Sequence, residues 1–261
     1  MSNNSHLEQK AASNGVSFLY IIGTPIGNLE DLSFRALRIL KEVDLILCED
    51  TRVTKKLLDN YEIKTPVLSY HQHSKLKKVE NILQLLKEGR NLALVSDAGT
   101  PGISDPGNLL VNEVIKRLVD ELRSSPPFAG AQVRDEVKVI PVPGPSAGIA
   151  AASISGFSMD KFIFMGFPPA KRKRKKFFEE VIKSKYPVIF YESPHRIIKT
   201  LNELNLESEA VWGELEVLVC RELTKKFETI YRGKIKEVIE KINSPAGEKI
   251  KGEFVVIVKR K

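Results

Sequence analysis

The chain has 261 residues, of which 42% are hydrophobic, a length and composition that suit one large domain or two modest ones with buried cores. Its net charge of +8 is compatible with a polyanionic partner but says nothing about fold. Two cysteines, Cys48 and Cys220, stand far apart in the sequence, which argues against a disulfide framework. No apolar run approaches the length of a membrane span, so we expect a cytoplasmic protein with a disordered tail over residues 1–15.

The first half of the chain alternates short apolar runs with amphipathic, helix-like patterns. Each run predicts a strand, and each amphipathic stretch that follows predicts a helix. We expect strands at residues 17–22, 45–48, 67–70, 92–95 and 137–142. Such regular alternation indicates a mostly parallel sheet with helices on both faces.

Three of these strands run into loops rich in glycine, proline and serine. The loops are residues 23–28 (GTPIGN), 96–107 (SDAGTPGISDPG) and 143–148 (PGPSAG). Glycines let a ligand approach the main chain, and backbone N–H groups and short polar side chains can hold it there. Asp105 can cap the helix that follows the second loop, and Pro106 fits the first position of that helix. A bound organic molecule is the natural inference.

The pattern changes in the second half of the chain. A change of rhythm near residues 156–160 places a boundary between an N-terminal α/β domain, residues 16–157, and a C-terminal α/β domain, residues 158–261. We expect strands at residues 162–167, 188–191, 217–220 and 253–258, and helices near Phe177, after Ser193 and over residues 235–242. The segment 124–130 (SSPPFAG) predicts an exposed excursion.

Six consecutive cations, residues 171–176 (KRKRKK), form the clearest charge feature. Most such runs are solvated helix starts. Cations at a helix N-terminus oppose the helix macrodipole, so this placement is not optimal for stability. We therefore favour neutralisation of phosphate groups as the use of this run.

A serine hydrolase is one alternative. Residues 144–148 match the pattern G-x-S-x-G in a strand-then-helix context, with Ser146 as the nucleophile. After Ser146 the only aspartate is Asp160 and the only histidine is His195, which stands at the start of a helix and not in a late loop, and a glutamate could substitute for the aspartate. The simpler interpretation is that Ser146 caps the alanine-rich helix that follows it.

Dinucleotide and metal sites receive less support. Gly23 and Gly27 are not spaced as G-x-G-x-x-G, and Pro25 removes an N–H group that a pyrophosphate could use. His71 and His73 lie two residues apart without an obvious third ligand, so we expect no metal.

A set of motifs in a fixed order resembles a known family. The motifs are residues 23–29 (GTPIGNL), 48–52 (CEDTR), 96–107, 143–147 (PGPSA), 192–196 (ESPHR), 220–225 (CRELTK) and 251–253 (KGE). Together they resemble the tetrapyrrole-methylase family of class III methyltransferases, and more narrowly its members that methylate ribosomal RNA. The match runs from about Phe18 to the C-terminus, and the excursion at residues 124–130 is a departure from it.

This resemblance implies two α/β domains of the tetrapyrrole-methylase type with S-adenosylmethionine in the cleft between them. It implies 2′-O-methylation of a cytidine ribose in the decoding region of 16S ribosomal RNA, within the small subunit, by a homodimer. Other relatives methylate tetrapyrrole rings, and the fold alone does not decide between substrates. The EDTR cluster and the basic run favour RNA. A non-catalytic RNA-binding module is a further alternative.

The resemblance also implies roles for particular residues. The donor is expected to touch Pro25, Asp97, Ala98, Gly99, Ile103, Ser146, Ala147, Tyr191, Arg221 and Gly252. Candidates for a catalytic base are Asp50 and Glu49, with Glu222 third, although each could instead form an ion pair with Arg52 or Arg221. Candidates for phosphate contacts are Arg52, Lys171, Arg172, Lys173, Arg174 and Arg196.

Overall fold

The computed structural model describes residues 16–70, 76–105, 107–124, 137–209, 215–243 and 250–260. The expectations for the N-terminal tail, His71, His73, Pro106 and nearly all of the excursion fall outside these ranges. The chain divides into two compact units: Met1–Pro25 with Leu29–Pro145, and Ile26–Asn28 with Ser146–Lys261. The division at Ser146 differs from the boundary expected at residue 157, because helix α6 (Ala147–Ser153) packs on strands of the second unit.

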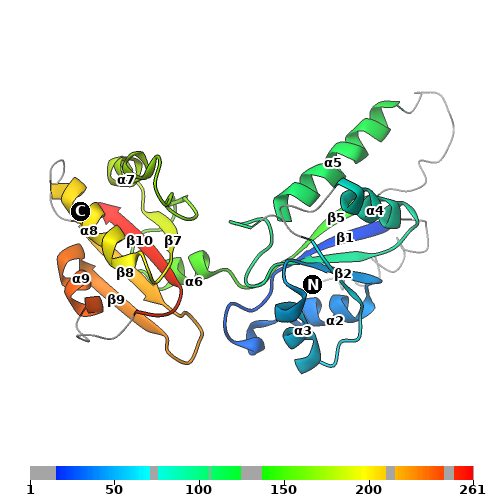
Figure 1. The fold of residues 1–261 in the computed structure, drawn as a ribbon, viewed down its shortest axis with the longest axis horizontal. Helices are drawn as coiled ribbons and strands as arrows, with labels where there is room; N and C mark the ends of the chain where they lie inside the picture. The colour runs from blue at the N-terminus through cyan, green and yellow to red at the C-terminus, as the bar shows by residue number, and fades with distance from the viewer. Residues whose placement is uncertain are drawn as a thin grey trace. The chain divides into compact units, whose positions relative to one another are not determined.

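The first unit is built on a wholly parallel five-stranded sheet, as expected. Its strands are β1 (Ser17–Ile22), β2 (Leu45–Cys48), β3 (Val67–Ser69), β4 (Leu92–Val95) and β5 (Val137–Val142), in the order β3-β2-β4-β1-β5 (Figure 1). Its helices are η1 (Leu29–Asp31), α2 (Phe34–Glu42), α3 (Thr51–Asn60), α4 (Leu76–Lys87) and α5 (Gly107–Ser124).

Helices cover both faces of this sheet, because alternate residues of each buried strand point to opposite sides. On one face Phe18 and Tyr20 of β1 pack with Ile39 of α2 and Leu58 of α3. On the other face Leu19 of β1 packs with residues of α4 and α5, among them Ile82, Leu86 and Leu110.

Strands β1 and β4 lie side by side, yet the helices that follow them cover opposite faces of the sheet. In open parallel sheets, ligands bind outside the carboxyl ends of strands at such a switch point. The two loops that the sequence singled out first, after β1 and after β4, begin there.

The second unit has a mixed five-stranded sheet. Its strands are β6 (Ile163–Phe164), β7 (Val188–Glu192), β8 (Leu215–Arg221), β9 (Thr229–Lys234) and β10 (Phe254–Arg260), in the order β6-β7-β10-β8-β9. Only β6 and β7 are parallel among its paired strands. Helices α7 (Arg174–Lys183), α8 (Ile197–Glu209) and α9 (Ile235–Asn243) bury Phe178, Leu204 and Val238 against one face (Figure 1).

Helix α6 and the segment Ile26–Asn28, which belongs to the second unit, pack on the opposite face of the second sheet. Ala151 of α6 and Ile26 pack there with Ile189 and Leu218. Within the described parts of the chain, no helix is both long enough and apolar enough to cross a membrane.

Candidate functional site

The loops after β1 and β4 are joined through Thr24 and Gly99. The Thr24 N–H donates to the Gly99 carbonyl at 2.9 Å, and the Gly99 N–H donates to the Thr24 carbonyl at 3.1 Å. The hydroxyls of Thr24 and Ser96 also donate to the Gly99 carbonyl, at 3.3 and 3.2 Å. This carbonyl is therefore committed to holding the loop, which positions the residues on either side of it.

The loop after β5 approaches the loop after β1 at two glycines. A Cβ atom on Gly144 would lie 2.6 Å from the Gly23 carbonyl oxygen, a distance that real Cβ atoms do not show. The Thr100 hydroxyl donates to the Pro145 carbonyl at 3.1 Å and brings in the loop after β4. The parts of the three predicted ligand loops that belong to the first unit thus meet at the carboxyl end of its sheet.

Asp105 closes the long loop as its predicted cap. One carboxylate oxygen accepts from the Gly102 N–H at 2.7 Å and from the Gly107 N–H, the first residue of α5, at 2.8 Å. The loop tip is left open to solvent, and the side chain of Ile103 is 50% exposed.

The predicted donor-binding residues of this unit differ in exposure. Asp97, Ala98 and Ile103 are exposed, Pro25 is half-buried, and Gly99 is buried at φ +83°. The exposed side chains belong to a loop that its hydrogen bonds hold in place, which is what a preformed binding loop requires.

The polar cluster after β2 is organised by Asp50. Its carboxylate accepts a hydrogen bond from the Arg52 backbone N–H at 2.8 Å and caps helix α3 in this way. The same carboxylate pairs with the Arg52 guanidinium at 2.6 Å. The Asp97 carboxylate accepts from the Asp50 N–H at 3.0 Å, which ties this cluster to the long loop.

These contacts decide the protonation of Asp50. The hydrogen bonds from Arg52 lower the pKa of the Asp50 carboxyl to about 2. A carboxylate with so low a pKa is a weak proton acceptor at neutral pH. The Arg52 side chain is 87% exposed and Glu49 is exposed beside it, so both can meet a substrate.

In the second unit, Tyr191 links strand β7 to the start of α6. The Gly148 N–H donates to the Tyr191 hydroxyl at 3.2 Å. Burial raises the pKa of this hydroxyl, although its hydrogen bonds to the Gly148 amide and the Ser146 side chain act in the opposite direction. Tyr191 is therefore a neutral hydroxyl that holds the N-terminal turn of α6, next to the predicted donor-binding residues Ser146 and Ala147.

Ser146 occupies the N-cap position of α6, but its side chain makes no capping hydrogen bond, so the expected capping is wrong. Its hydroxyl is used by Tyr191 instead. Asp160, which a hydrolase would need near His195, accepts a hydrogen bond from Ser158 at 2.7 Å. The described contacts contain no nucleophile–base pair for the hydrolase alternative.

Glu222 sits in a strained turn after β8, with φ +52°. Its carboxylate accepts from the Lys225 ammonium and from the Glu253 N–H, both at 2.9 Å. Burial raises the pKa of the Glu222 carboxyl, but these hydrogen bonds outweigh it and the pKa lies below its ordinary value.

The ion-pair partner of Glu222 is therefore Lys225 and not Arg221, the partner that the sequence suggested. The Arg221 Nε donates to the Lys251 carbonyl at 2.7 Å. Gly252 (φ +101°) lies so near that a Cβ there would be 2.5 Å from the Glu222 Cγ. The residues around Glu222 thus hold the turns 221–225 and 251–253 together.

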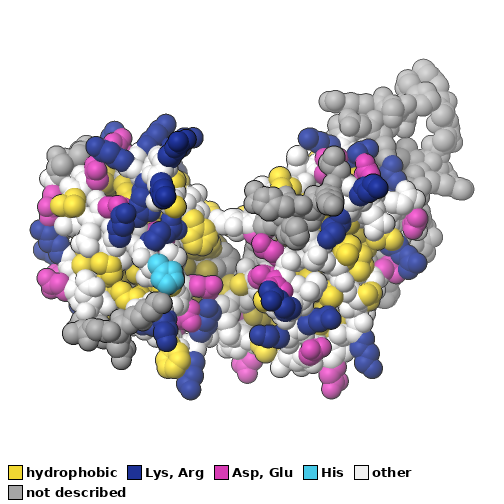
Figure 2. Space-filling view, in the orientation of Figure 1, with side chains coloured by type: hydrophobic (Ala, Val, Ile, Leu, Met, Phe, Trp, Pro, Cys, Tyr) yellow, Lys and Arg dark blue, Asp and Glu magenta, His cyan; other side chains and the backbone are white. Residues whose placement is uncertain are grey.

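The basic run is split by burial. Lys171, Arg172, Lys173, Lys175 and Lys176 are exposed, and they surround the first turn of α7, a region where Figure 2 shows Lys and Arg side chains gathered. Arg174 is only 7% exposed.

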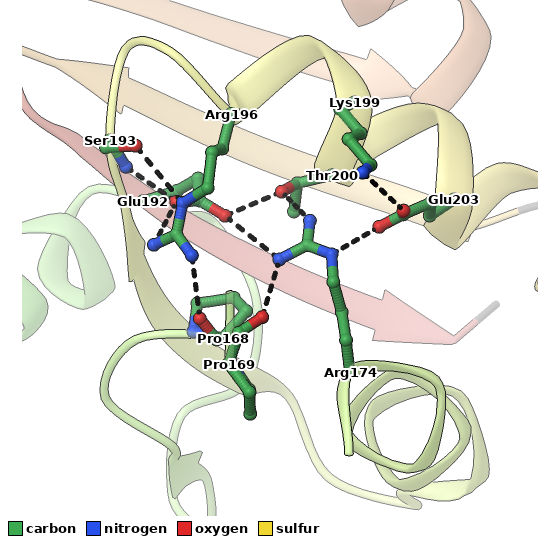
Figure 3. Close-up of polar contacts among 9 residues, drawn as sticks. All are labelled: Pro168, Pro169, Arg174, Glu192, Ser193, Arg196, Lys199, Thr200 and Glu203. Atoms are coloured by element: carbon green, nitrogen blue, oxygen red, sulfur yellow. Dashed lines mark hydrogen bonds and ion pairs between the residues drawn. The ribbon is translucent and has the colours of Figure 1, made fainter. Parts of the chain in front are cut away.

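The guanidinium of Arg174 points into the second unit and not toward solvent. It donates to the Glu203 carboxylate at 2.6 Å, the Thr200 hydroxyl at 2.5 Å and the Pro169 carbonyl at 3.1 Å (Figure 3). The expectation that Arg174 contacts phosphate is therefore corrected, because its donors are already used.

Arg196 is half-buried and also serves the structure. It pairs with the buried Glu192 carboxylate at 2.8 Å and donates to the Pro168 carbonyl at 3.1 Å (Figure 3). Sequence reasoning noted Glu192 in a motif without giving it a task, and it did not single out Thr200 or Glu203 at all. Among the residues that the structure describes, no three His, Cys, Asp or Glu side chains gather as a metal site would require.

Comparisons with known proteins agree on one family. The model of the tetrapyrrole (corrin/porphyrin) methylases matches residues 18–122 and 128–239. A protein of Halalkalibacterium halodurans named ribosomal RNA small subunit methyltransferase I is 44% identical over 241 residues, 92% of this chain and 75% of that protein. A protein of the same name from Thermotoga maritima is 43% identical over 243 residues, 93% of this chain and 98% of that protein.

Among solved structures, the methyltransferase CobJ superimposes with a TM-score of 0.60 at 18% identity, covering 94% of this chain and 93% of that one. At this identity the likeness concerns the fold alone.

Proposed function

Since this chain belongs to the tetrapyrrole methylase family, we propose that it uses S-adenosylmethionine to 2′-O-methylate the ribose of a cytidine in the decoding region of 16S ribosomal RNA. The observation that carries the proposal is the identity of 43–44%, over more than nine-tenths of the chain, to relatives named for methylation of small-subunit ribosomal RNA. The alternative is a tetrapyrrole-ring substrate, which the family description names; the solved structures that are 16–18% identical share the fold alone.

We assign the donor in the first unit to the loop of residues 96–105 and to Pro25. An S-adenosylmethionine molecule offers an ammonium, a carboxylate and an apolar adenosine. The exposed Asp97 carboxylate suits the ammonium, main-chain groups of Ala98 and its neighbours suit polar atoms, and the exposed Ile103 suits the adenosine. When bound, the donor supplies a methyl group already activated on a sulfonium.

The second unit supplies the remaining proposed donor contacts: Ser146, Ala147, Tyr191, Arg221 and Gly252. The ordered N-terminal turn of α6, held by the Tyr191 hydroxyl, supports this assignment. Gly252 is included because its motif is part of the resemblance, and its lack of a side chain lets Glu222 pack against it.

With an activated methyl group, this chain must chiefly align the ribose oxygen and take up its proton. Asp50 and Glu222 are poor bases, because cationic partners stabilise their charged forms. We propose Glu49, which is exposed next to Asp50, as the base. Asp50 becomes a positioning residue that orients the Arg52 guanidinium toward an RNA phosphate.

The RNA-binding surface is proposed to comprise Arg52 in the first unit and the exposed members of the basic run in the second. The substrate is proposed to be the RNA within the small ribosomal subunit, which places the protein in the cytoplasm. The homodimer implied by the resemblance also remains a proposal.

Labelled methyl donor tests the proposed substrate class. Purified protein is incubated with small subunits from cells lacking this modification, or with a tetrapyrrole acceptor. Label is expected in the RNA of the subunits and not in the tetrapyrrole. Label in the tetrapyrrole alone would overturn the proposal in favour of the alternative. Ester hydrolysis that is lost in Ser146→Ala, without donor binding, would favour the hydrolase.

A further inference from the structure

A cavity of about 380 Å³ opens between α7 and α8 of the second unit. The charged side chains that line it are Lys171, Arg174, Lys175, Lys199, Glu203 and Glu207, four cations against two carboxylates. Lys171 and Lys175 belong to the basic run that the sequence singled out, whereas Lys199 does not. The cavity does not include Tyr191 or any other proposed donor contact of this unit.

Arg174 forms a fixed wall of this cavity. Its guanidinium spans the Glu203 carboxylate, the Thr200 hydroxyl and the Pro169 carbonyl, and Thr200 passes a hydrogen bond on to the buried Glu192 at 2.6 Å (Figure 3). These contacts hold the first turn of α7 against α8. They also neutralise Glu203, so this carboxylate does little to cancel the positive charge of the lysines.

The lysines around this wall are available for a ligand. Lys171 and Lys175 are exposed, and neither has a carboxylate partner among the described residues. Lys199 is 67% exposed, and its nitrogen lies 3.8 Å from Glu203, a long, solvated pair that contributes little. Three ammonium groups, from the segment before α7, from α7 and from α8, therefore surround one cavity, and the long pair of Lys199 with Glu203 is their one carboxylate contact among the described residues.

We infer that this cavity binds a backbone phosphate of the substrate RNA, with Lys171, Lys175 and Lys199 as its donors. The inference rests on the proposed function, adds Lys199 to the RNA-binding surface and assigns Lys171 and Lys175 to one phosphate site. Lysine serves phosphate as a mobile point charge, which suits the varied geometry of a single strand. The neighbouring exposed cations of the run, Arg172 among them, extend the positive surface along which a polyanion would lie (Figure 2).

The test compares two double variants that remove the same charge. Lys175→Gln with Lys199→Gln empties the cavity of two ammonium groups. The matched control, Lys183→Gln with Lys241→Gln, removes two exposed lysines of the same unit, at the last turns of α7 and α9 and away from the cavity. Binding of a fluorescent single-stranded RNA is measured by anisotropy over a range of potassium chloride concentrations.

For the cavity variant, the slope of log affinity against log salt is expected to become shallower by about 1.4, that is, about 0.7 for each lost phosphate contact. The control variant is expected to keep the wild-type slope. Equal slopes for the two variants, whether changed or unchanged, would overturn the inference.

Two further measurements distinguish an RNA phosphate from a free phosphate, and failure of the proposed function from failure of this inference. Inorganic phosphate at matched ionic strength is expected to compete no better than chloride with RNA for the wild-type protein. Strong competition that disappears in the cavity variant would mean a free-anion site and would overturn the RNA assignment. A wild-type protein that transfers no methyl group to small subunits fails the proposed function itself, whereas normal transfer with equal slopes fails only this inference.

Discussion

Glu49 and Asp50 are adjacent carboxylates to which their surroundings give different tasks. Asp50 caps α3 and binds Arg52, which lowers its pKa to about 2, whereas Glu49 is the more exposed of the two. Both were candidate bases in the sequence analysis, because the sequence alone does not show which carboxylate forms an ion pair with Arg52. Their chemistry follows from the turn between β2 and α3.

Substitutions at these two carboxylates should separate their roles. Glu49→Gln removes the proposed base and is expected to lower kcat by about 10²- to 10⁴-fold without changing donor affinity. Asp50→Asn leaves Arg52 without its ionic partner and is expected to raise KM for RNA by about fivefold or less. Single-turnover methylation and calorimetric titration of the donor measure both effects. A larger kcat loss in Asp50→Asn than in Glu49→Gln would return the base to Asp50.

Gly144 provides a second test at the scale of one residue. A methyl group there meets the Gly23 carbonyl at 2.6 Å, so Gly144→Ala must push the loops after β1 and β5 apart. We expect a loss of about 1–3 kcal/mol in unfolding free energy and a weaker affinity for S-adenosylmethionine.

The matched control for this variant is Gly89→Ala, which places a Cβ in open space at φ +83°. Its cost should be about 1–2 kcal/mol of backbone strain, with donor affinity intact. Unchanged donor affinity in both variants would disconnect the contact between Gly23 and Gly144 from the donor site.

At the scale of elements, the strands of the first sheet were predictable and one edge strand of the second sheet was not. The observed bounds of β1, β2 and β4 coincide with their apolar runs, because a strand covered by helices on both faces is mostly apolar. Strand β9 was missed, because it pairs with β8 alone and its residues include the exposed Arg232 and Lys234. The run at residues 171–176 likewise gives no sign that its fourth cation is the buried one.

We expect the position of helix α7 to depend on the buried Arg174. Arg174→Gln leaves Glu192 and Glu203 with fewer partners in a buried setting, and a loss of about 3–5 kcal/mol is expected in urea unfolding. Lys171→Gln, a neighbouring cation that is exposed, is expected to change unfolding free energy by less than about 0.5 kcal/mol. Similar stability of the two variants would contradict the structural role of Arg174.

The turn that carries Glu222 should respond to acid. Its pKa is lowered in the folded protein, so the stability it contributes is present above its ordinary pKa of 4.5 and is lost as pH falls through the folded value. Glu222→Gln removes this contribution and should flatten the decline of Tm with acidification in that range. A parallel decline in both proteins, measured by calorimetry in matched buffers, would show that Glu222 is not linked to folding.

For the whole molecule, the net charge of +8 indicates a binding surface only once the exposed cations are separated from the buried ones. In the second unit, the exposed members of the basic run and Lys199 frame one face of α7 and α8, while Arg174 and Arg196 hold the structure beneath. The family and the loops at the carboxyl end of the first sheet were predictable, because they depend on motifs that are local in sequence. The division of cations between surface and interior was not, because it depends on tertiary packing.

Mapping the modified nucleotide tests the central claim most directly. Small subunits from cells lacking the modification are incubated with the protein and methyl-labelled S-adenosylmethionine, and the 16S ribosomal RNA is digested and analysed by mass spectrometry. We predict one labelled methyl group on the ribose 2′-oxygen of a single cytidine in the decoding region, and none with Glu49→Gln under the same conditions. A label on a base, on a ribose outside that region, or on no nucleotide at all would contradict the account.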